Sequence, residues 1–129
     1  MSTRELNRGA EWHRWEPHIH APGTILNDQY GGEEAWSSYL DRIEAVRPPI
    51  QALGITDYLS IETYTTVLAY KKQGRLKDVQ LVFPNVEMRL GLGTVQGQAI
   101  NIHLIFSPDD PNHAGEITRF LQRLTFKDD

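Results

Sequence analysis

The sequence lacks cysteine altogether, which excludes disulfide bonds, thiolate metal sites and a cysteine nucleophile. No apolar run approaches the roughly 18 residues that a membrane-spanning helix needs, and residues 1–10 are polar, unlike a signal peptide. Basic residues are also few: 13 Lys and Arg against 17 Asp and Glu leave a net charge of -4. These absences favour a cytoplasmic location. They leave no whole-chain basic surface for nucleic acid, although bound metal ions would reverse the charge of a local site.

Short apolar segments alternate with helical patterns along the 129 residues, as in a single α/β domain. Pro84 is expected to end the third strand. The elements that we predict are strands at 15–21, 50–56 and 79–83, a hairpin of 86–90 with 99–106, and helices starting near Gly32, Ser60 and Asn112. The resulting order β-α-β-α-β-β-α predicts the first part of a (β/α) barrel, because a closed barrel needs about eight βα units.

The region that carries the chemical motifs covers 12–106, between an N-terminal arm at 1–11 and a helical end at 107–129. An unclosed half-barrel would expose an edge strand and leave apolar helix faces uncovered. We therefore expect residues 1–129 to be one incomplete domain. It should associate with itself, with a partner, or with a missing C-terminal half, and it should have little activity alone.

The first candidate site residues are His18 and His20, on the first predicted strand. Because side chains alternate across a strand, Glu16, His18 and His20 should share one face. Two imidazoles about 7 Å apart along a strand can converge on one metal ion. The alternative is that two histidines simply lie near a strand end.

Glu87 and His103 extend this candidate site. Glu87 follows an apolar strand, where α/β folds place their ligands; the common alternative is a solvated loop carboxylate. His103 should lie on the strand face opposite Ile102 and Leu104, as a metal ligand or as a core histidine bonded to the backbone. Together, three histidines and one glutamate on successive strand units form a ligand set typical of Zn²⁺ or Mn²⁺.

Other polar residues have less specific assignments. Asp57 ends the second predicted strand and could cap the next helix, orient a ligand or bind metal; Ser60 competes for the capping role. Trp12 and Arg14 belong to a basic and aromatic cluster that could stack on nucleic-acid bases, or simply cover the first strand. His113 is expected to lie near a helix start.

Four segments, in order, resemble motifs of the PHP (polymerase and histidinol phosphatase) family. WEPHIHAP at 15–22 is similar to its first motif, an Asp followed by H-x-H-T, and GITDY at 54–58 is similar to I-T-D-H. FPNVE at 83–87 is similar to P-G-x-E, and NIHLIF at 101–106 is similar to the strand that carries a metal-binding His. The resemblance covers roughly 12–106.

One branch of this family resembles the chain most closely. It has Tyr after I-T-D, P-N-x-E in place of P-G-x-E, and an N-I-H-L-x-F strand. In that branch, related to the TrlF group, the PHP domain precedes a large AAA- or SMC-like ATPase. Tyr58 and Leu26 stand at or near positions where the family usually has histidines of a third metal site. The resemblance therefore implies two metal sites here rather than three.

The resemblance implies a distorted (β/α) barrel with metals at the C-terminal ends of its strands. His18, His20 and Glu87 would hold the first metal, and Glu87 would bridge to a second metal shared with His103. Tyr58, like Asp57, would then contact the metal ligands and orient them without binding the metal itself.

These features predict a metal-dependent phosphoesterase of the two-metal type. The branch resemblance favours a phosphodiester in nucleic acid, in a defence or DNA-repair system with an ATPase domain or subunit as partner. One alternative is a decayed, non-catalytic PHP module that docks an ATPase. Another is an amidohydrolase-like barrel, which also begins with H-x-H on its first strand. Metal content separates a docking module from an enzyme.

Overall fold

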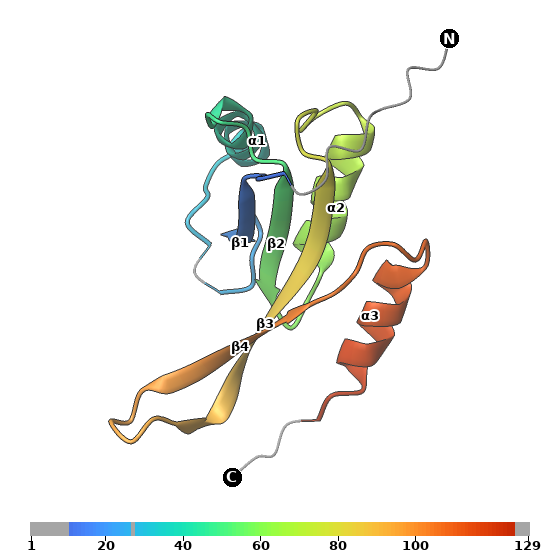
Figure 1. The fold of residues 1–129 in the computed structure, drawn as a ribbon. Coiled ribbons are helices and arrows are strands. Elements are labelled where there is room, and N and C mark those ends of the chain that lie inside the picture. Colours follow the sequence, from blue (N-terminus) through green and yellow to red (C-terminus); the bar gives the residue numbers. More distant parts are fainter. Residues whose placement is uncertain (1–10, 27, 126–129) are drawn as a thin grey trace.

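The computed structural model describes residues 11–26 and 28–125 and shows a mixed α/β fold on one curled four-stranded sheet, about half a barrel (Figure 1). Its elements are β1 (Trp15–His20), α1 (Ala35–Ala45), β2 (Ala52–Tyr58), α2 (Glu62–Lys72), β3 (Leu81–Gly93), β4 (Ala99–Ile105) and α3 (His113–Gln122). This order confirms the predicted β-α-β-α-β-β-α pattern. The expected arm at 1–11, apart from its last residue, and 126–129 of the helical end lie outside the described residues. No helix in the described ranges is long and apolar enough to cross a membrane.

The strand order in the sheet is β1-β2-β3-β4, with the first three strands parallel and β4 antiparallel to β3. The carboxyl ends of β1 and β2 therefore meet at the same edge. The register pairs His20 with Thr56, Tyr58 with Glu87, and Glu87 with His103. Residues paired in this way face the same side of a sheet, and Thr56 and Tyr58, two positions apart, also share a side, so all five side chains lie on one polar face of the sheet.

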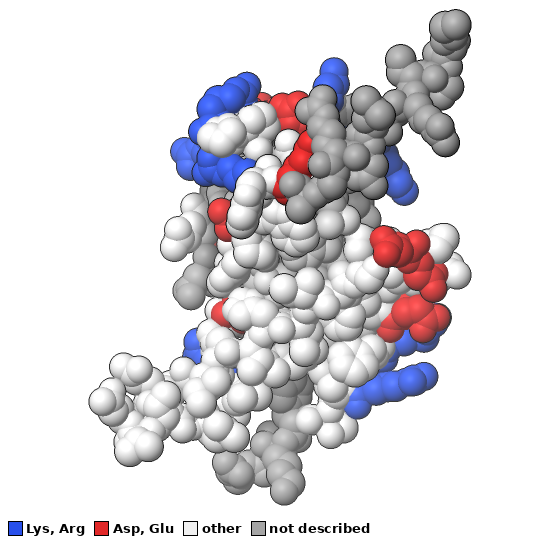
Figure 2. All heavy atoms as spheres, in the orientation of Figure 1, with Lys and Arg blue, Asp and Glu red and all other residues white. Residues whose placement is uncertain are grey.

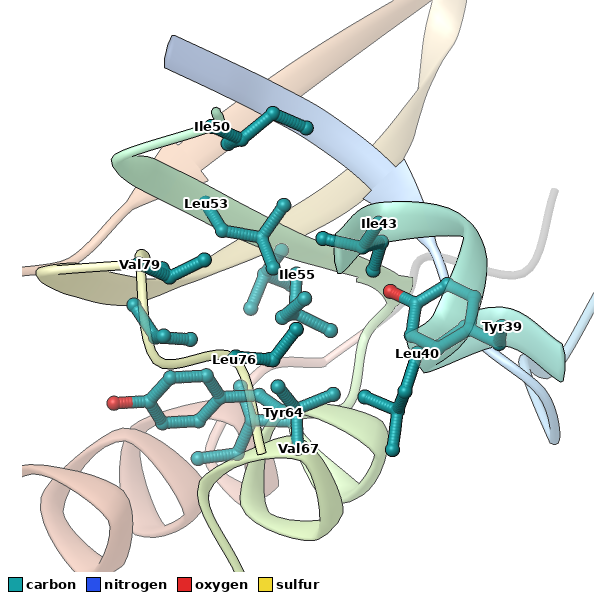
Figure 3. Close-up of a cluster of buried hydrophobic side chains, with 14 of the residues drawn as sticks. Tyr39, Leu40, Ile43, Ile50, Leu53, Ile55, Tyr64, Val67, Leu76 and Val79 are labelled. Atoms are coloured by element: carbon teal, nitrogen blue, oxygen red, sulfur yellow. The ribbon is translucent and has the colours of Figure 1, made fainter. Parts of the chain in front are cut away.

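One face of the sheet packs against the helices. Figure 3 shows side chains of α1 and α2 meeting Leu53 and Ile55 of β2. The helices contribute buried side chains at helical spacing: Tyr39, Leu40 and Ile43 from α1, Tyr64 and Val67 from α2, and Ile117 from α3. Burying one of the aliphatic side chains among them contributes about 1.5–3 kcal/mol. This packed core holds the strands in place, and with them the polar side chains on the other face of the sheet.

β3 continues through Pro84, so the prediction that Pro84 ends this strand is wrong. Pro84 lacks an N–H group, but its carbonyl oxygen accepts a hydrogen bond of 3.1 Å from the backbone N–H of Phe106. That bond lies just beyond the end of β4 at Ile105. The proline thus stands where the β3–β4 ladder stops, and a missing donor costs little there.

β1 contains a bulge that breaks the expected alternation. Glu16 pairs with Leu53 and Ile19 pairs with Ile55, so a three-residue step in β1 opposes a two-residue step in β2. The prediction that Glu16 shares a face with the two histidines is therefore wrong. Glu16 lies on the helix side, where it lines a pocket with Ile19 and with residues of α1.

The bulge requires a glycine on the neighbouring strand. A Cβ atom at Gly54 would lie 2.2 Å from the carbonyl oxygen of Pro17 and 2.7 Å from the Phe83 ring. No side chain fits at that distance. Gly54 thus lets the Pro17 carbonyl group, which lies in the bulge just before His18, approach the backbone of β2 closely.

Candidate metal site

Four of the residues singled out in the sequence come together on the face opposite the helices. His18 and His20 come from β1, Glu87 from β3 and His103 from β4. His18, Glu87 and His103 each offer one ligand atom within 4.8 Å of the others. His20 is the fourth member, because its Nε2 atom lies 3.4 Å from Oε2 of Glu87.

The centre of the cluster is a buried carboxylate oxygen. Glu87 is 3% exposed, and its Oε2 atom has no hydrogen-bond partner among the described residues. The Nε2 atoms of His18 and His20 lie 3.6 and 3.4 Å from this oxygen and 3.2 Å from each other. A charge-assisted hydrogen bond would be shorter, about 2.7–2.9 Å. Ligand atoms about 2.1 Å from a tetrahedral ion lie about 3.4 Å apart, so this spacing fits a metal site better than a set of ion pairs.

The other oxygen of Glu87 faces a different histidine. Its Oε1 atom accepts a hydrogen bond of 2.8 Å from the side-chain amide of Asn101 and lies 4.0 Å from Nε2 of His103. The His18 and His103 rings are 4.6 Å apart between centroids. A carboxylate whose two oxygens face different imidazoles can bridge two ions. Sequence reasoning missed Asn101, although it lies two positions before His103 and so shares its face.

Asn85 holds His103 in place and was also missed. Its side-chain N–H donates to the carbonyl oxygen of Pro17 at 2.9 Å, and its Oδ1 atom lies 3.0 Å from Nδ1 of His103. An amide oxygen only accepts, so Nδ1 of His103 carries the proton and Nε2 keeps a free electron pair towards Glu87. The buried Asn85 side chain thus links the bulge of β1 to the metal-facing form of His103.

We expect Asn85→Ala to weaken Mn²⁺ binding by roughly 10–100-fold, the usual cost of losing a residue that orients a metal ligand. The reason is that the Nδ1–H tautomer of His103 loses the acceptor that selects it. Calorimetry measures the affinity, and ¹⁵N NMR of the imidazole in the metal-free protein reports the tautomer. Asn85→Asp should restore the tautomer but oppose the Pro17 carbonyl with a carboxylate. An unchanged tautomer and affinity in Asn85→Ala would contradict this role.

Asp57 and Thr24 together hold His20 in position by hydrogen bonds. The buried Asp57 carboxylate accepts hydrogen bonds from the Thr24 hydroxyl at 2.8 Å and from the backbone N–H groups of Ile25 and Tyr58 at 3.0 and 2.7 Å. Because the Thr24 hydroxyl donates its proton to Asp57, it accepts from Nδ1 of His20, which lies 3.2 Å away. Nε2 of His20 therefore carries no proton, and its electron pair faces Glu87 and Nε2 of His18, from which it can accept a hydrogen bond at 3.2 Å. The sequence did not point to Thr24, because its contact with Asp57 depends on the path of the loop that follows β1.

Tyr58 borders the same site. Its ring lies nearly parallel to that of His20, with centroids 5.8 Å apart and an interplanar angle of 25°. Partial burial, together with the charge of the nearby Glu87 carboxylate, raises the pKa of the Tyr58 phenol above its usual value. A tyrosine phenol is protonated at neutral pH even at its ordinary pKa of about 10, so Tyr58 can donate a hydrogen bond.

The other sequence candidates lie away from this cluster. Trp12 and Arg14 precede β1, at the end of the strand opposite His20, and Arg14 donates to the backbone carbonyls of Arg47 and Pro48 at 3.3 Å. The Ser60 hydroxyl accepts a hydrogen bond from the backbone N–H of Glu62, the first residue of α2, whereas Asp57 bonds elsewhere. His113 begins α3, as expected, and its ring lies 2.6 Å from the Tyr64 hydroxyl.

The arrangement as a whole is a buried carboxylate between three imidazoles, with each imidazole on an ordered strand of the sheet. Two of the imidazoles, His20 and His103, have partners on Nδ1 that leave Nε2 without a proton. Such a set can hold one or two divalent cations. Comparisons of this chain with protein-family models, with curated proteins and with solved structures found no match.

Proposed function

We propose that this chain carries the metal site of a phosphoesterase of the PHP type, on the first part of a distorted (β/α) barrel. The observation that carries the proposal is the environment of Glu87. Its buried Oε2 atom has no hydrogen-bond partner among the described residues and lies 3.4–3.6 Å from two imidazole nitrogens. The open half-barrel sheet and the position of the cluster near the carboxyl ends of β1 and β2 also support it.

The donor set favours Zn²⁺ or Mn²⁺, because it combines imidazole nitrogen with carboxylate oxygen and offers no thiolate. His18, His20 and Glu87 would hold one ion. His103 and the second oxygen of Glu87 would serve a second ion. With metal bound, these residues would hold ions that can activate water for hydrolysis at neutral pH and stabilise negative charge on a phosphoryl group.

The surrounding residues would keep these ligands in position. Asp57 acts on His20 through Thr24, whereas Asn85 acts directly on His103. A ligand that is already oriented loses little conformational freedom when the ion binds, which raises the affinity. The protonated phenol of Tyr58 would be available to donate a hydrogen bond to an oxygen of the substrate.

We favour a phosphodiester substrate in nucleic acid, with an ATPase domain or subunit as partner in a defence or repair system. This choice rests on the resemblance of the motifs. Figure 2 shows that Lys and Arg lie towards the edges of the face in view, whereas uncharged residues occupy its middle. The four proposed metal ligands include no Lys or Arg, so attraction of a phosphate group at this site would come from bound metal ions more than from basic side chains.

The test is a titration of the purified protein with Mn²⁺ and Zn²⁺, alongside an assay of a generic phosphodiester. We expect His18→Ala to weaken metal binding by roughly a hundredfold or more, because it removes a direct ligand. His13→Ala is the matched control, since His13 lies before β1 and bonds to Gln51 instead. A parent protein that binds neither ion would favour the non-catalytic docking module, and equal binding by His18→Ala and the parent would exclude the assigned ligands.

A further inference from the structure

A pocket of about 240 Å³ opens beside the proposed metal site, lined by His20, Leu26, Gln29, Tyr30 and Tyr58. It shares His20 with the metal site, and Tyr58 pairs directly with Glu87 across the sheet. A group bound in this pocket would therefore be attached closely to a phosphate held at the metal site.

The walls of the pocket are held by contacts outside it. The Tyr30 hydroxyl donates to the backbone carbonyl of His20 at 3.3 Å, and its ring meets that of Tyr39 edge-on at 5.4 Å. The Asp28 carboxylate accepts from the backbone N–H groups of Gly23 and Tyr30, each at 2.9 Å, which fixes the loop that carries the pocket. The aromatic surfaces are thus in place before a ligand arrives.

The lining chemistry selects the kind of group that fits. None of the five lining residues is Lys, Arg, Asp or Glu, so a second phosphate would find no cation there. Gln29 offers an amide that both donates and accepts hydrogen bonds, while the rings of Tyr30 and Tyr58 and the side chain of Leu26 offer apolar surface. The volume is below the roughly 300–1,000 Å³ of sites for drug-sized ligands. These properties fit one flat, uncharged ring system with polar edges.

We propose that this pocket holds the nucleobase of a nucleotide whose phosphate lies at the metal site, which makes the substrates nucleoside phosphoesters. The inference rests on the proposed function, because it needs phosphate at the neighbouring site. A base stacks on aromatic side chains through its π-face, whatever its identity. The pocket would therefore give affinity for nucleotides with little preference among bases.

The experiment compares two probes that differ only in the base, adenosine 5′-monophosphate and ribose 5-phosphate, with the Mn²⁺-loaded full chain. Calorimetry should show the nucleotide binding roughly tenfold or more tightly, as expected for one stacked base. In NMR spectra of the Zn²⁺-loaded chain, where no paramagnetic ion broadens the signals, the base should shift the backbone amides of Leu26, Tyr30 and Tyr58. Leu26→Trp should fill the pocket and abolish the difference between the probes without weakening ribose 5-phosphate. Leu92→Trp, in the exposed β3–β4 hairpin, is the matched control.

The outcomes separate this inference from the proposed function. Equal affinity for the two probes, or a preference for the nucleotide that Leu26→Trp leaves intact, would overturn the pocket assignment. Binding of ribose 5-phosphate that requires Mn²⁺ would still support the phosphate site in that case. Failure of both probes would overturn the pocket assignment as well, and the Mn²⁺ titration would then show whether the metal site itself fails.

Discussion

Glu87→Gln should abolish detectable binding of Mn²⁺ and Zn²⁺ while leaving the fold intact. Glutamine has the same shape, but its amide carries no negative charge and its N–H₂ group cannot bind a cation. With its oxygen still accepting from Asn101, the amide nitrogen would point at the imidazoles of His18 and His20 and could donate to them. The metal-free variant should therefore be as stable as the parent or more stable by about 1 kcal/mol, because a buried, unpaired oxygen gives way to a hydrogen-bonded group.

Two measurements check this expectation: metal titration, and thermal unfolding in EDTA and in excess Mn²⁺. The parent should gain stability from the ion in proportion to the logarithm of its concentration, whereas Glu87→Gln should gain none. Glu116→Gln is the matched control, since Glu116 is exposed on α3 and bonds to Arg119. A Glu87→Gln variant that keeps the metal-dependent gain of the parent would show that Glu87 is not the central ligand.

The ligand positions were accessible from the sequence because they follow local rules. His103 was expected on the face opposite Ile102 and Leu104. The structure packs Leu104 against the core and pairs Ile102 with Met88, which also packs there, while His103 faces the cluster. Strand periodicity needs only the neighbours of a residue along the chain. Another local signal, the glycine-rich segment at 91–97, predicted the β3–β4 hairpin, although β3 continues into that segment as far as Gly93.

The orienting residues could not be predicted in the same way, because their partners are remote in sequence. Asn85 contacts the carbonyl of Pro17, 68 positions away, and His103, 18 positions away. Asp57 reaches Thr24 across 33 positions. Which atoms meet depends on the register between strands, and single-residue shifts in register reverse the face of every side chain. The polar residues were visible, but their partners were not. The PHP-type closure of the barrel, the ATPase partner and the expected self-association remain predictions.

The failed prediction for Glu16 has the same origin and leads to the largest expected effect on stability. Gly54→Ala should lower the free energy of unfolding by about 3 kcal/mol or more, because the new Cβ atom would lie 2.2 Å from the Pro17 carbonyl oxygen. Backbone atoms on both strands would have to separate. That separation would also stretch the hydrogen bond of 2.9 Å from Asn85 to Pro17. In a chain of 129 residues, a loss of this size lowers the unfolding temperature by about 10 °C or more.

The same substitution at Gly115 is the matched control, because that glycine lies inside α3 and a Cβ atom there would meet nothing within 4 Å. Gly115→Ala should stabilise the protein by about 0.5–1 kcal/mol through helix propensity. If Gly54→Ala remains folded at low temperature, its stability gain from Mn²⁺ should be smaller than in the parent, since displacing the bulge moves His18 away from Glu87. An unfolding temperature equal to that of the parent would refute the close approach of β1 and β2. A lower unfolding temperature with an unchanged gain from Mn²⁺ would show that the bulge supports the fold but does not set the position of His18.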